Sequence, residues 1–209
     1  MRNLWISHPF FFSPQFVLRN LGSYHGIVFS ETFGSQAYTV RLRVEGLRDL
    51  GSCISPYNSF QLLQGLETLM IRMKAMSTTT LELAQWLREH PLVAWVKYPL
   101  LESHPDYNSC KERLSQGAGA ILTFGAKGGF EASKKVCEST KLFKIVANLG
   151  DSKSLLIHPG STTHNQLSPE DQESAGITPD LIRLAIGLED IEDIKQDLDQ
   201  ALRIAHEYL

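Results

Sequence analysis

The sequence has 209 residues, of which 43% are hydrophobic and 21% are charged, and this composition is that of a folded globular protein rather than a disordered chain. Its 20 basic and 23 acidic residues give a net charge of −3 at neutral pH. Because proteins that bind nucleic acid neutralise phosphates with a surplus of Lys and Arg, we expect no nucleic-acid partner.

The three cysteines, Cys53, Cys110 and Cys137, lie far apart and form no C-x-x-C pair. This spacing excludes a dense disulfide framework and a cysteine zinc site, and it suits a reducing compartment, so we expect a cytoplasmic protein. No stretch reaches the ~18 uninterrupted apolar residues of a membrane span, so we expect no membrane partner. The apolar run after Arg2 is interrupted from Ser7 onward, so we expect no secretory signal.

Residues 1–34 are interpreted as an irregular, aromatic-rich arm. Prolines at the density found here prevent a regular helix, and phenylalanines lie between them: Pro9, Phe10, Phe11, Phe12, Pro14 and Phe16. These rings need another surface to cover them. We expect much of the ring area between Phe10 and Phe16 to be exposed to solvent.

Residues 35–90 are predicted to be mostly helical. Apolar residues recur at three- and four-residue steps between Ala37 and Leu47, which is the helical period. Gly51 follows the last of these steps and suits the end of a helix.

A second helical stretch is predicted over residues 56–90. Ser55 followed by Pro56 has the pattern of an N-cap and a first helical residue. The 3.6-residue period then continues with an expected bend near Gly65, and Pro91 ends it.

Short apolar runs alternate with amphipathic helices over residues 91–209, which is the pattern of an α/β domain. The predicted strands and helices are, in chain order, a strand at 93–96, a helix at 107–114, a strand at 120–124, a helix at 131–140, strands at 144–147 and 181–186, and a helix from about residue 190. We expect a small domain in which a four-stranded sheet carries helices mainly on one face.

Arg183 lies inside an apolar strand run, between Ile182 and Leu184. A guanidinium in such a run is tolerated where something anionic meets it, and its planar fork binds a carboxylate through two parallel hydrogen bonds. The alternative is that Arg183 simply points outward on an alternating strand whose two neighbours point inward. The pattern by itself leaves both interpretations open.

The segment 148–164 is predicted to be a long loop, and long loops in compact domains often carry function. His158 and His164 lie in this segment. Their spacing matches no common zinc motif and no Cys or carboxylate completes a ligand set, so we expect no metal site and assign the two histidines to hydrogen bonds that support the loop. The sequence contains no nucleophile elbow and no phosphate-binding loop of the usual kinds.

Five strings of the sequence resemble one family and follow one another in that family's order. They are SYHG at 23–26, RVEGLRDLG at 43–51, SPYNSFQLLQGLETL at 55–69, NLGDSKSLLIHPGSTTH at 148–164 and GITPDLIRLAIGLEDIEDI at 176–194. The family is that of the Cys/Met-metabolism enzymes that depend on pyridoxal phosphate. The resemblance runs from about Tyr24 to the C-terminus and implies the C-terminal part of an aspartate-aminotransferase-like fold.

The same resemblance implies pyridoxal 5'-phosphate as the cofactor. The family's S-x-T-K motif, which carries the Schiff-base lysine, has no counterpart in this sequence. The family's phosphate-binding glycine turn, ring-stacking tyrosine and pyridine-nitrogen aspartate have none either. We therefore expect a truncated member of the family, without a catalytic lysine and inactive by itself.

Within the family, the strings are most similar to the O-acetylhomoserine sulfhydrylases. This implies a small-molecule amino-acid substrate and a γ-replacement in which O-acetylhomoserine and sulfide give homocysteine and acetate, a reaction of methionine biosynthesis. Two substrate-binding residues carry over from the family. Arg183 in LIRLAIG matches the arginine that holds the substrate α-carboxylate, and Asn148 in NLGD matches a position that helps to orient it.

Two alternatives stay open at this point. The parent enzyme is of the cystathionine γ-synthase or γ-lyase type in the first. In the second, the chain is a non-catalytic module that associates with a full-length paralogue. Separately, the family resemblance implies homo-oligomers.

Overall fold

A computed structural model describes residues 24–208 of the chain, which divides into two compact units, Met1–Gln64 and Gly65–Leu209. The aromatic strip from Phe10 to Phe16 lies outside the described residues. The boundary between the units falls inside the segment that the sequence predicts to be helical. The division into segments 1–34, 35–90 and 91–209 stays a prediction.

The described part of the first unit begins with a series of short helical segments. They are α2 (Phe29–Phe33), the 3-10 turn η2 (Gly34–Gln36), α3 (Ala37–Arg41) and the π-helical η3 (Leu42–Asp49). Phe29 and Ala37 are buried, and the guanidinium of Arg41 pairs with Glu45 at 2.9 Å. Gly51 follows η3 with φ at +71°, a conformation that favours glycine, so the predicted end of this helical stretch is confirmed.

Two longer helices follow, α4 (Pro56–Glu67) and α5 (Leu69–Glu89). The hydroxyl of Ser55 accepts a hydrogen bond from the N–H of Asn58 at 3.1 Å, which confirms the predicted N-cap. The helices are separated at Thr68, close to the bend expected near Gly65, and α5 ends just before Pro91.

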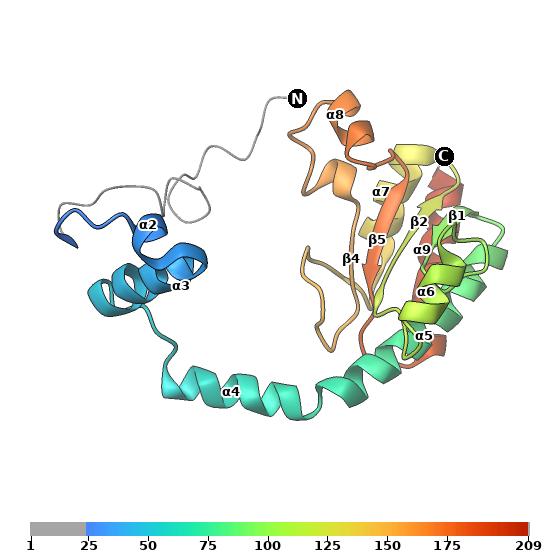
Figure 1. Ribbon diagram of the computed structural model, residues 1–209. Coiled ribbons are helices and arrows are strands. Elements are labelled where there is room, and N and C mark those ends of the chain that lie inside the picture. The colour runs from blue at the N-terminus through green and yellow to red at the C-terminus, as the bar shows by residue number, and fades with distance from the viewer. Residues whose placement is uncertain (1–23, 209) are drawn as a thin grey trace. The chain divides into compact units, whose positions relative to one another are not determined.

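The second unit contains a five-stranded mixed sheet, and this confirms the α/β class. The strands are β1 (Val93–Lys97), β2 (Ile121–Ala126), β3 (Lys144–Ile145), β4 (Leu155–Ile157) and β5 (Leu181–Ala185). They lie side by side in the order β1-β2-β5-β4-β3, and Figure 1 labels β1, β2, β4 and β5. All neighbours are antiparallel except β3 and β4.

The expected number of four strands is wrong. The additional strand, β4, lies inside the segment 148–164 that the sequence predicts to be a loop, and β3 has two residues instead of the four expected at 144–147. A run of three residues is too short to show the alternation that identifies a strand. It becomes one because β5 supplies its hydrogen-bonding partners.

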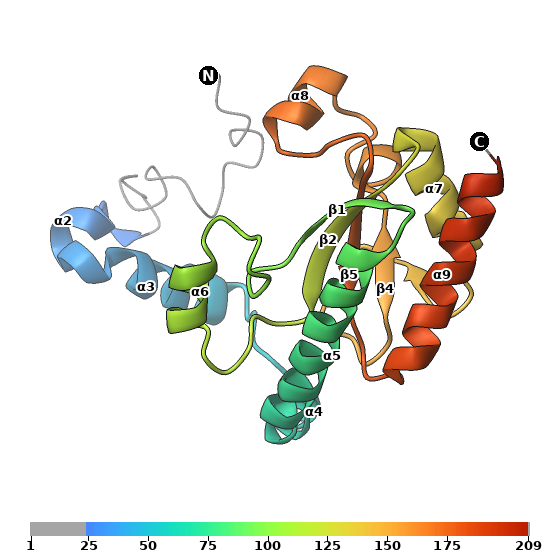
Figure 2. The same cartoon turned by 90° about the vertical axis from the view of Figure 1, so that its right-hand side faces the viewer.

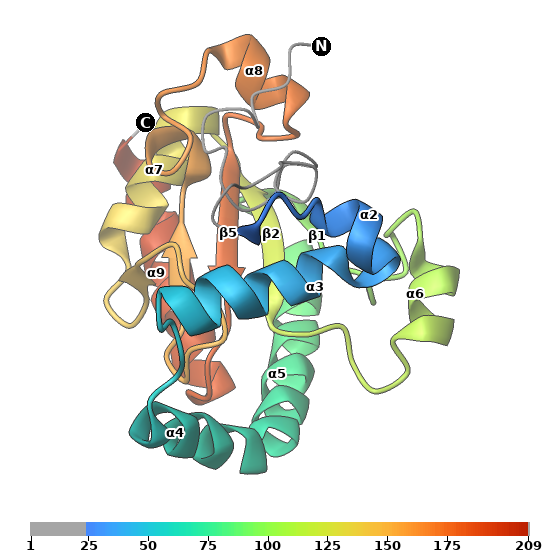
Figure 3. The same cartoon turned by 60° about the vertical axis from the view of Figure 1, so that its left-hand side comes forward.

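Three helices cover one face of this sheet, as predicted. They are α5, α7 (Gly129–Ser139) and α9 (Ile191–Tyr208). Figure 2 shows α5 and α9 in front of the strands, and Figure 3 shows β5 in front of α9 from the other side. The shorter α6 (Tyr107–Arg113) connects β1 to β2, and η4 (Pro159–Ser161) and α8 (Pro169–Ser174) lie between β4 and β5 in the chain.

The core lies between the covered face of the sheet and these helices. The strands contribute one set of buried side chains and the helices another: Leu122, Phe124, Leu156, Ile182 and Leu184 from the sheet, and Leu83, Leu87, Val136, Ile194, Leu198 and Leu202 from the helices. Each large side chain buried in this way contributes about 1.5–3 kcal/mol relative to an exposed one. None of the helices within residues 24–208 has the combination of length and apolar character required to cross a lipid bilayer.

Candidate substrate-carboxylate site

Arg183 lies in the middle of β5, between two strands of the sheet. Successive side chains of a strand point to opposite faces, so the fully buried Ile182 and Leu184 face the helices and Arg183 lies on the opposite face. This opposite face carries none of α5, α7 and α9. A cation is tolerated there because that face is only half-buried at Arg183.

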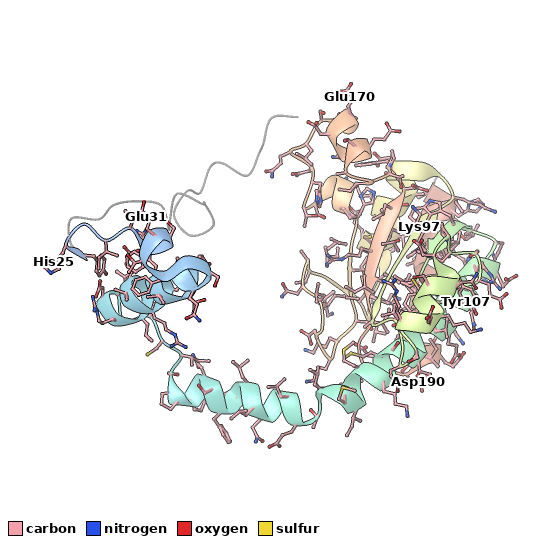
Figure 4. The ribbon with its side chains drawn as sticks, viewed as in Figure 1. His25, Glu31, Lys97, Tyr107, Glu170 and Asp190 are labelled. Atoms are coloured by element: carbon pink, nitrogen blue, oxygen red, sulfur yellow. The ribbon has the colours of Figure 1, made fainter. Side chains whose placement is uncertain are left out.

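The register of the sheet places Arg183 in a row of four residues. It pairs with Thr123 of β2 on one side and with Ile157 of β4 on the other, and Thr123 pairs in turn with Lys97 of β1. Directly paired residues share a face, so Lys97 and Arg183 lie on the same side of the sheet. Figure 4 labels Lys97 on β1. The row itself contains two cations and no carboxylate, and the carboxylate of Asp180 on the same face is bonded to the indole of Trp95. Positive charge therefore predominates along the row.

The guanidinium of Arg183 is held by main-chain carbonyls. Its Nη2 donates to the carbonyl oxygen of Ala147 at 2.7 Å and to that of Asn148 at 3.1 Å. Both carbonyls belong to residues 146–154, the β3–β4 loop. Main-chain acceptors without charge orient the arginine but do not neutralise it, so its positive charge remains for a ligand.

The remaining nitrogens of Arg183 have no acceptor within residues 24–208. Nε is shielded from solvent and makes no hydrogen bond, and both side-chain hydrogen bonds of Arg183 come from Nη2 rather than Nη1. A buried donor without a partner costs roughly 1–3 kcal/mol. Charge-assisted hydrogen bonds from these N–H groups to a carboxylate would remove that cost, so the guanidinium has free donors for an anionic ligand.

Asn148 takes part through its main chain. Its carbonyl contacts Arg183, whereas its side chain is exposed and makes no hydrogen bond to the part of the chain that the structure describes. The two residues proposed from the sequence, 35 positions apart, therefore meet. The carbonyl of Ala147 also accepts a hydrogen bond from Arg183. The sequence could not predict this contact, because every residue type has a main-chain carbonyl.

Of the two histidines of the expected loop, His158 has the supporting role proposed for it. His158 is 1% exposed, and its Nε2 lies 2.8 Å from the carbonyl of Pro179 while Nδ1 lies 2.8 Å from the hydroxyl of Ser161. Burial lowers the pKa of His158, so the ring is neutral, with Nε2 as donor and Nδ1 as acceptor. Nδ1 of His164 lies 2.8 Å from the hydroxyl of Thr163. Across residues 24–208, no three His, Cys, Asp or Glu side chains gather in a way that could hold a metal ion.

Comparison with known proteins shows which family the chain is similar to. Residues 23–203 match the model of a family described as Cys/Met metabolism PLP-dependent enzyme. The matched range includes the whole sheet, the β3–β4 loop and most of α9.

The chain is also similar in sequence to enzymes of known name over about the same range. The chain is 48% identical over 179 residues to O-acetyl-L-homoserine sulfhydrylase 1 of Thermus thermophilus, covering 86% of this chain and 42% of the relative. It is 51% identical over 182 residues to homocysteine synthase of Schizosaccharomyces pombe, covering 87% of this chain and 42% of the relative. The chain thus spans less than half the length of these relatives.

A solved structure is similar in fold as well as in sequence. It is an O-acetylhomoserine (thiol)-lyase of Campylobacter jejuni that contains N'-pyridoxyl-lysine-5'-monophosphate. The TM-score is 0.77 at 42% sequence identity, and the match covers 90% of this chain and 44% of that one.

Proposed function

Since this chain belongs to the family of Cys/Met metabolism PLP-dependent enzymes, we propose that it is the substrate-carboxylate-binding part of an O-acetylhomoserine sulfhydrylase. The parent reaction is the γ-replacement of acetate by sulfide, which converts O-acetylhomoserine to homocysteine. The unpaired, solvent-shielded Nε of Arg183 is the observation that carries this proposal. The names of the relatives support the substrate class.

In this proposal Arg183 binds and orients the substrate. Its N–H groups donate to the α-carboxylate, and the two carbonyls of the β3–β4 loop keep the guanidinium in one orientation. Because the arginine belongs to a rigid sheet, it fixes the α-carboxylate end of the substrate. The reacting carbon at the other end of the substrate is thereby positioned. O-acetylhomoserine and cystathionine both carry an α-carboxylate, so this contact serves either type of parent enzyme.

The residues of this chain do not fit the whole cofactor. Pyridoxal phosphate is held through a lysine amine, which must lose its proton to react. All lysines of the sequence lie within the described range, and none is buried. Lys195, whose side chain is 17% exposed, forms ion pairs with Glu192 and Glu82 that raise its pKa and keep it protonated. We therefore assign no step of cofactor chemistry to this chain, and propose that it has no turnover by itself.

The binding part of the proposal can be tested by titration. The full chain is titrated with O-acetyl-L-homoserine, and the affinity is measured by NMR of the ¹⁵N-labelled arginines. One bidentate carboxylate contact supports an affinity no better than about millimolar. We expect Arg183→Lys to weaken binding about tenfold or more, since lysine cannot donate two parallel hydrogen bonds.

Arg113→Lys is the matched control. Arg113 lies on α6, and its side chain is exposed and makes no hydrogen bond to the described residues, so this substitution should leave the affinity unchanged. Equal affinity of the wild type and Arg183→Lys would refute the proposal.

A second candidate function is association with a full-length sulfhydrylase, and the surface of α4 favours it. Large apolar side chains of this helix are more than half exposed: Tyr57, Phe60, Leu62, Leu63 and Leu66. They are distributed around the helix, and a helix that is apolar on all sides is normally buried. Three cysteines without disulfides suit the cytoplasm, where such a partner would be found.

The association can be tested with a defined partner. The chain is mixed with the homocysteine synthase of Schizosaccharomyces pombe, and the mass of the eluting species is measured by light scattering after gel filtration. A stoichiometric complex that is lost in Leu63→Gln and kept in Leu114→Gln, a control outside α4, would support it. Separate elution of the two proteins would refute it.

A further inference from the structure

The carbonyls of the β3–β4 loop orient Arg183, so the position of the loop itself must be fixed by other contacts. Its residues from Ala147 to Lys153 are exposed, so packing contributes little to its position. Loops with few buried contacts open at low cost in free energy. The orientation of the guanidinium therefore depends on polar contacts that fix the loop.

Such contacts are found where the loop enters β4. The side chain of Ser154 is fully buried, and its N–H and its hydroxyl donate to the two carboxylate oxygens of Glu189, at 2.7 and 2.8 Å. The same hydroxyl accepts a hydrogen bond from the N–H of Gly187 at 2.9 Å, and the N–H of Leu188 donates to the carbonyl of Ser152 at 2.9 Å. Both oxygens of Glu189 are thus committed to one residue of the loop.

Gly187 provides independent evidence that the segment 187–189 lies close against the β3–β4 loop. A Cβ atom at this position would lie 2.4 Å from the carbonyl oxygen of Ser152 and 2.6 Å from the carbonyl carbon of Lys153. Both are backbone atoms, which cannot yield as the end of a side chain can. The turn at 187–189 therefore approaches the loop as closely as a backbone can, and only glycine permits this approach.

Arg183 and this turn belong to the same stretch of chain. β5 ends at Ala185, so the arginine lies in the strand and Glu189 four residues beyond its end. The loop is thus bound twice from one element, at Ala147 and Asn148 by Arg183 and at Ser154 by Glu189. Resting on the proposed function of Arg183, we infer that Glu189 is a positioning residue, which holds the β3–β4 loop so that its carbonyls orient the guanidinium for a carboxylate.

The experiment uses the full chain with ¹⁵N-labelled arginine. The Nε–H signal of Arg183 is identified by its loss in Arg183→Lys, and two quantities are measured: its exchange with water without ligand, and the affinity for O-acetyl-L-homoserine. In Glu189→Gln, one oxygen becomes an NH₂ group that meets a donor of Ser154. We expect faster exchange of the Nε–H and an affinity about fivefold weaker, the effect of one lost hydrogen bond.

Ser154→Ala keeps the bond from the main-chain N–H and loses those of the hydroxyl, so it should change both quantities in the same direction. It also keeps the test valid if Glu189→Gln fails to fold, which circular dichroism will show. Glu112→Gln on α6 is the control, because the carboxylate of Glu112 is exposed and bonds to no described residue. Wild-type exchange and affinity in both Glu189→Gln and Ser154→Ala would overturn the inference.

The two proposals fail in different ways. If O-acetyl-L-homoserine does not bind the wild type, the proposed function fails. The exchange of the Arg183 Nε–H without ligand still decides whether Glu189 orders the arginine. A lower melting temperature with unchanged Nε–H exchange would show a structural role only, and would also overturn the inference.

Discussion

Trp95 on β1 donates its indole N–H to the carboxylate of Asp180 at 2.6 Å, although 85 residues separate them. The contact passes over Gly125 on the intervening strand β2, which pairs with Trp95 on one side and with Leu181 on the other. A Cβ atom on Gly125 would lie 2.2 Å from the carboxylate and 2.3 Å from the indole nitrogen. The hydrogen bond therefore exists because residue 125 has no side chain.

Gly125→Ala should break this hydrogen bond. The added methyl group must displace the indole or the carboxylate, and overpacking of this kind costs about 1–3 kcal/mol. We expect a lower free energy of unfolding in urea and a changed fluorescence of Trp95. Gly65→Ala is the control of opposite sign, because Gly65 lies inside α4 with open space around it and alanine favours a helix by about 0.5–1 kcal/mol. Equal stability of the two variants would contradict the prediction.

Asp197 on α9 should be important for stability. Its buried carboxylate accepts hydrogen bonds from the main-chain N–H groups of Lys141, Leu142 and Phe143, at 2.8, 2.8 and 3.2 Å. In Asp197→Asn, an NH₂ group faces one or more of these donors, and we expect a loss of about 2–3 kcal/mol. The measurement is chemical denaturation, with Asp193→Asn on the exposed side of α9 as the control. A loss no greater than that of the control would show that the three contacts are not needed.

His158 should make stability depend on pH. Burial lowers its pKa in the folded chain, Lys134 lowers it further, and the carbonyl of Pro179 and the charges of Asp180 and Glu131 oppose the shift. The unfolded chain therefore takes up a proton at a higher pH than the folded chain does. The contribution of His158 to stability is complete above its unfolded pKa of about 6.5, and is lost as the pH falls from there towards the folded value.

The test compares urea denaturation between about pH 5 and about pH 7.5 in the wild type and two variants. His158→Gln cannot titrate, so its free energy of unfolding should be lower at neutral pH and should vary less with pH. His206→Gln on the exposed side of α9 should keep the pH dependence of the wild type. An unchanged slope in His158→Gln would refute the assignment.

The isolated chain should show no γ-replacement. Purified chain is mixed with pyridoxal phosphate, O-acetylhomoserine and sulfide, and homocysteine is assayed. We expect no product above background, because none of the lysines is buried in a site that would remove its proton for attack on the cofactor's aldehyde. The homocysteine synthase of Schizosaccharomyces pombe serves as the active control. Homocysteine production that one Lys→Ala substitution abolishes would show that this chain contains a working lysine.

Some features of the protein could be predicted from the sequence because they depend on neighbours along the chain. The stripe of Ile194, Leu198 and Leu202 repeats at the helical period, and α9 buries all three. The N-cap at Ser55 is likewise a contact with a residue three positions away. The family resemblance, which long strings in one order carry, is a property of the sequence as well.

Other features arise only when distant segments meet. The run from Leu155 to Ile157 is a strand because β5 pairs with it, and no local period marks three residues as a strand. The pattern at Arg183 left two interpretations open, and the unpaired Nε that favours one of them appears only after the β3–β4 loop has folded over the guanidinium. The hydrogen bonds that Ser154 donates to Glu189 join residues 35 positions apart. The sequence by itself therefore determined the class of the domain, its helices and its family, since these follow from periodicity and from strings of adjacent residues. The tertiary structure alone decided the fifth strand and the surroundings of the arginine, because strand register and main-chain acceptors are set by contacts between segments far apart in the chain.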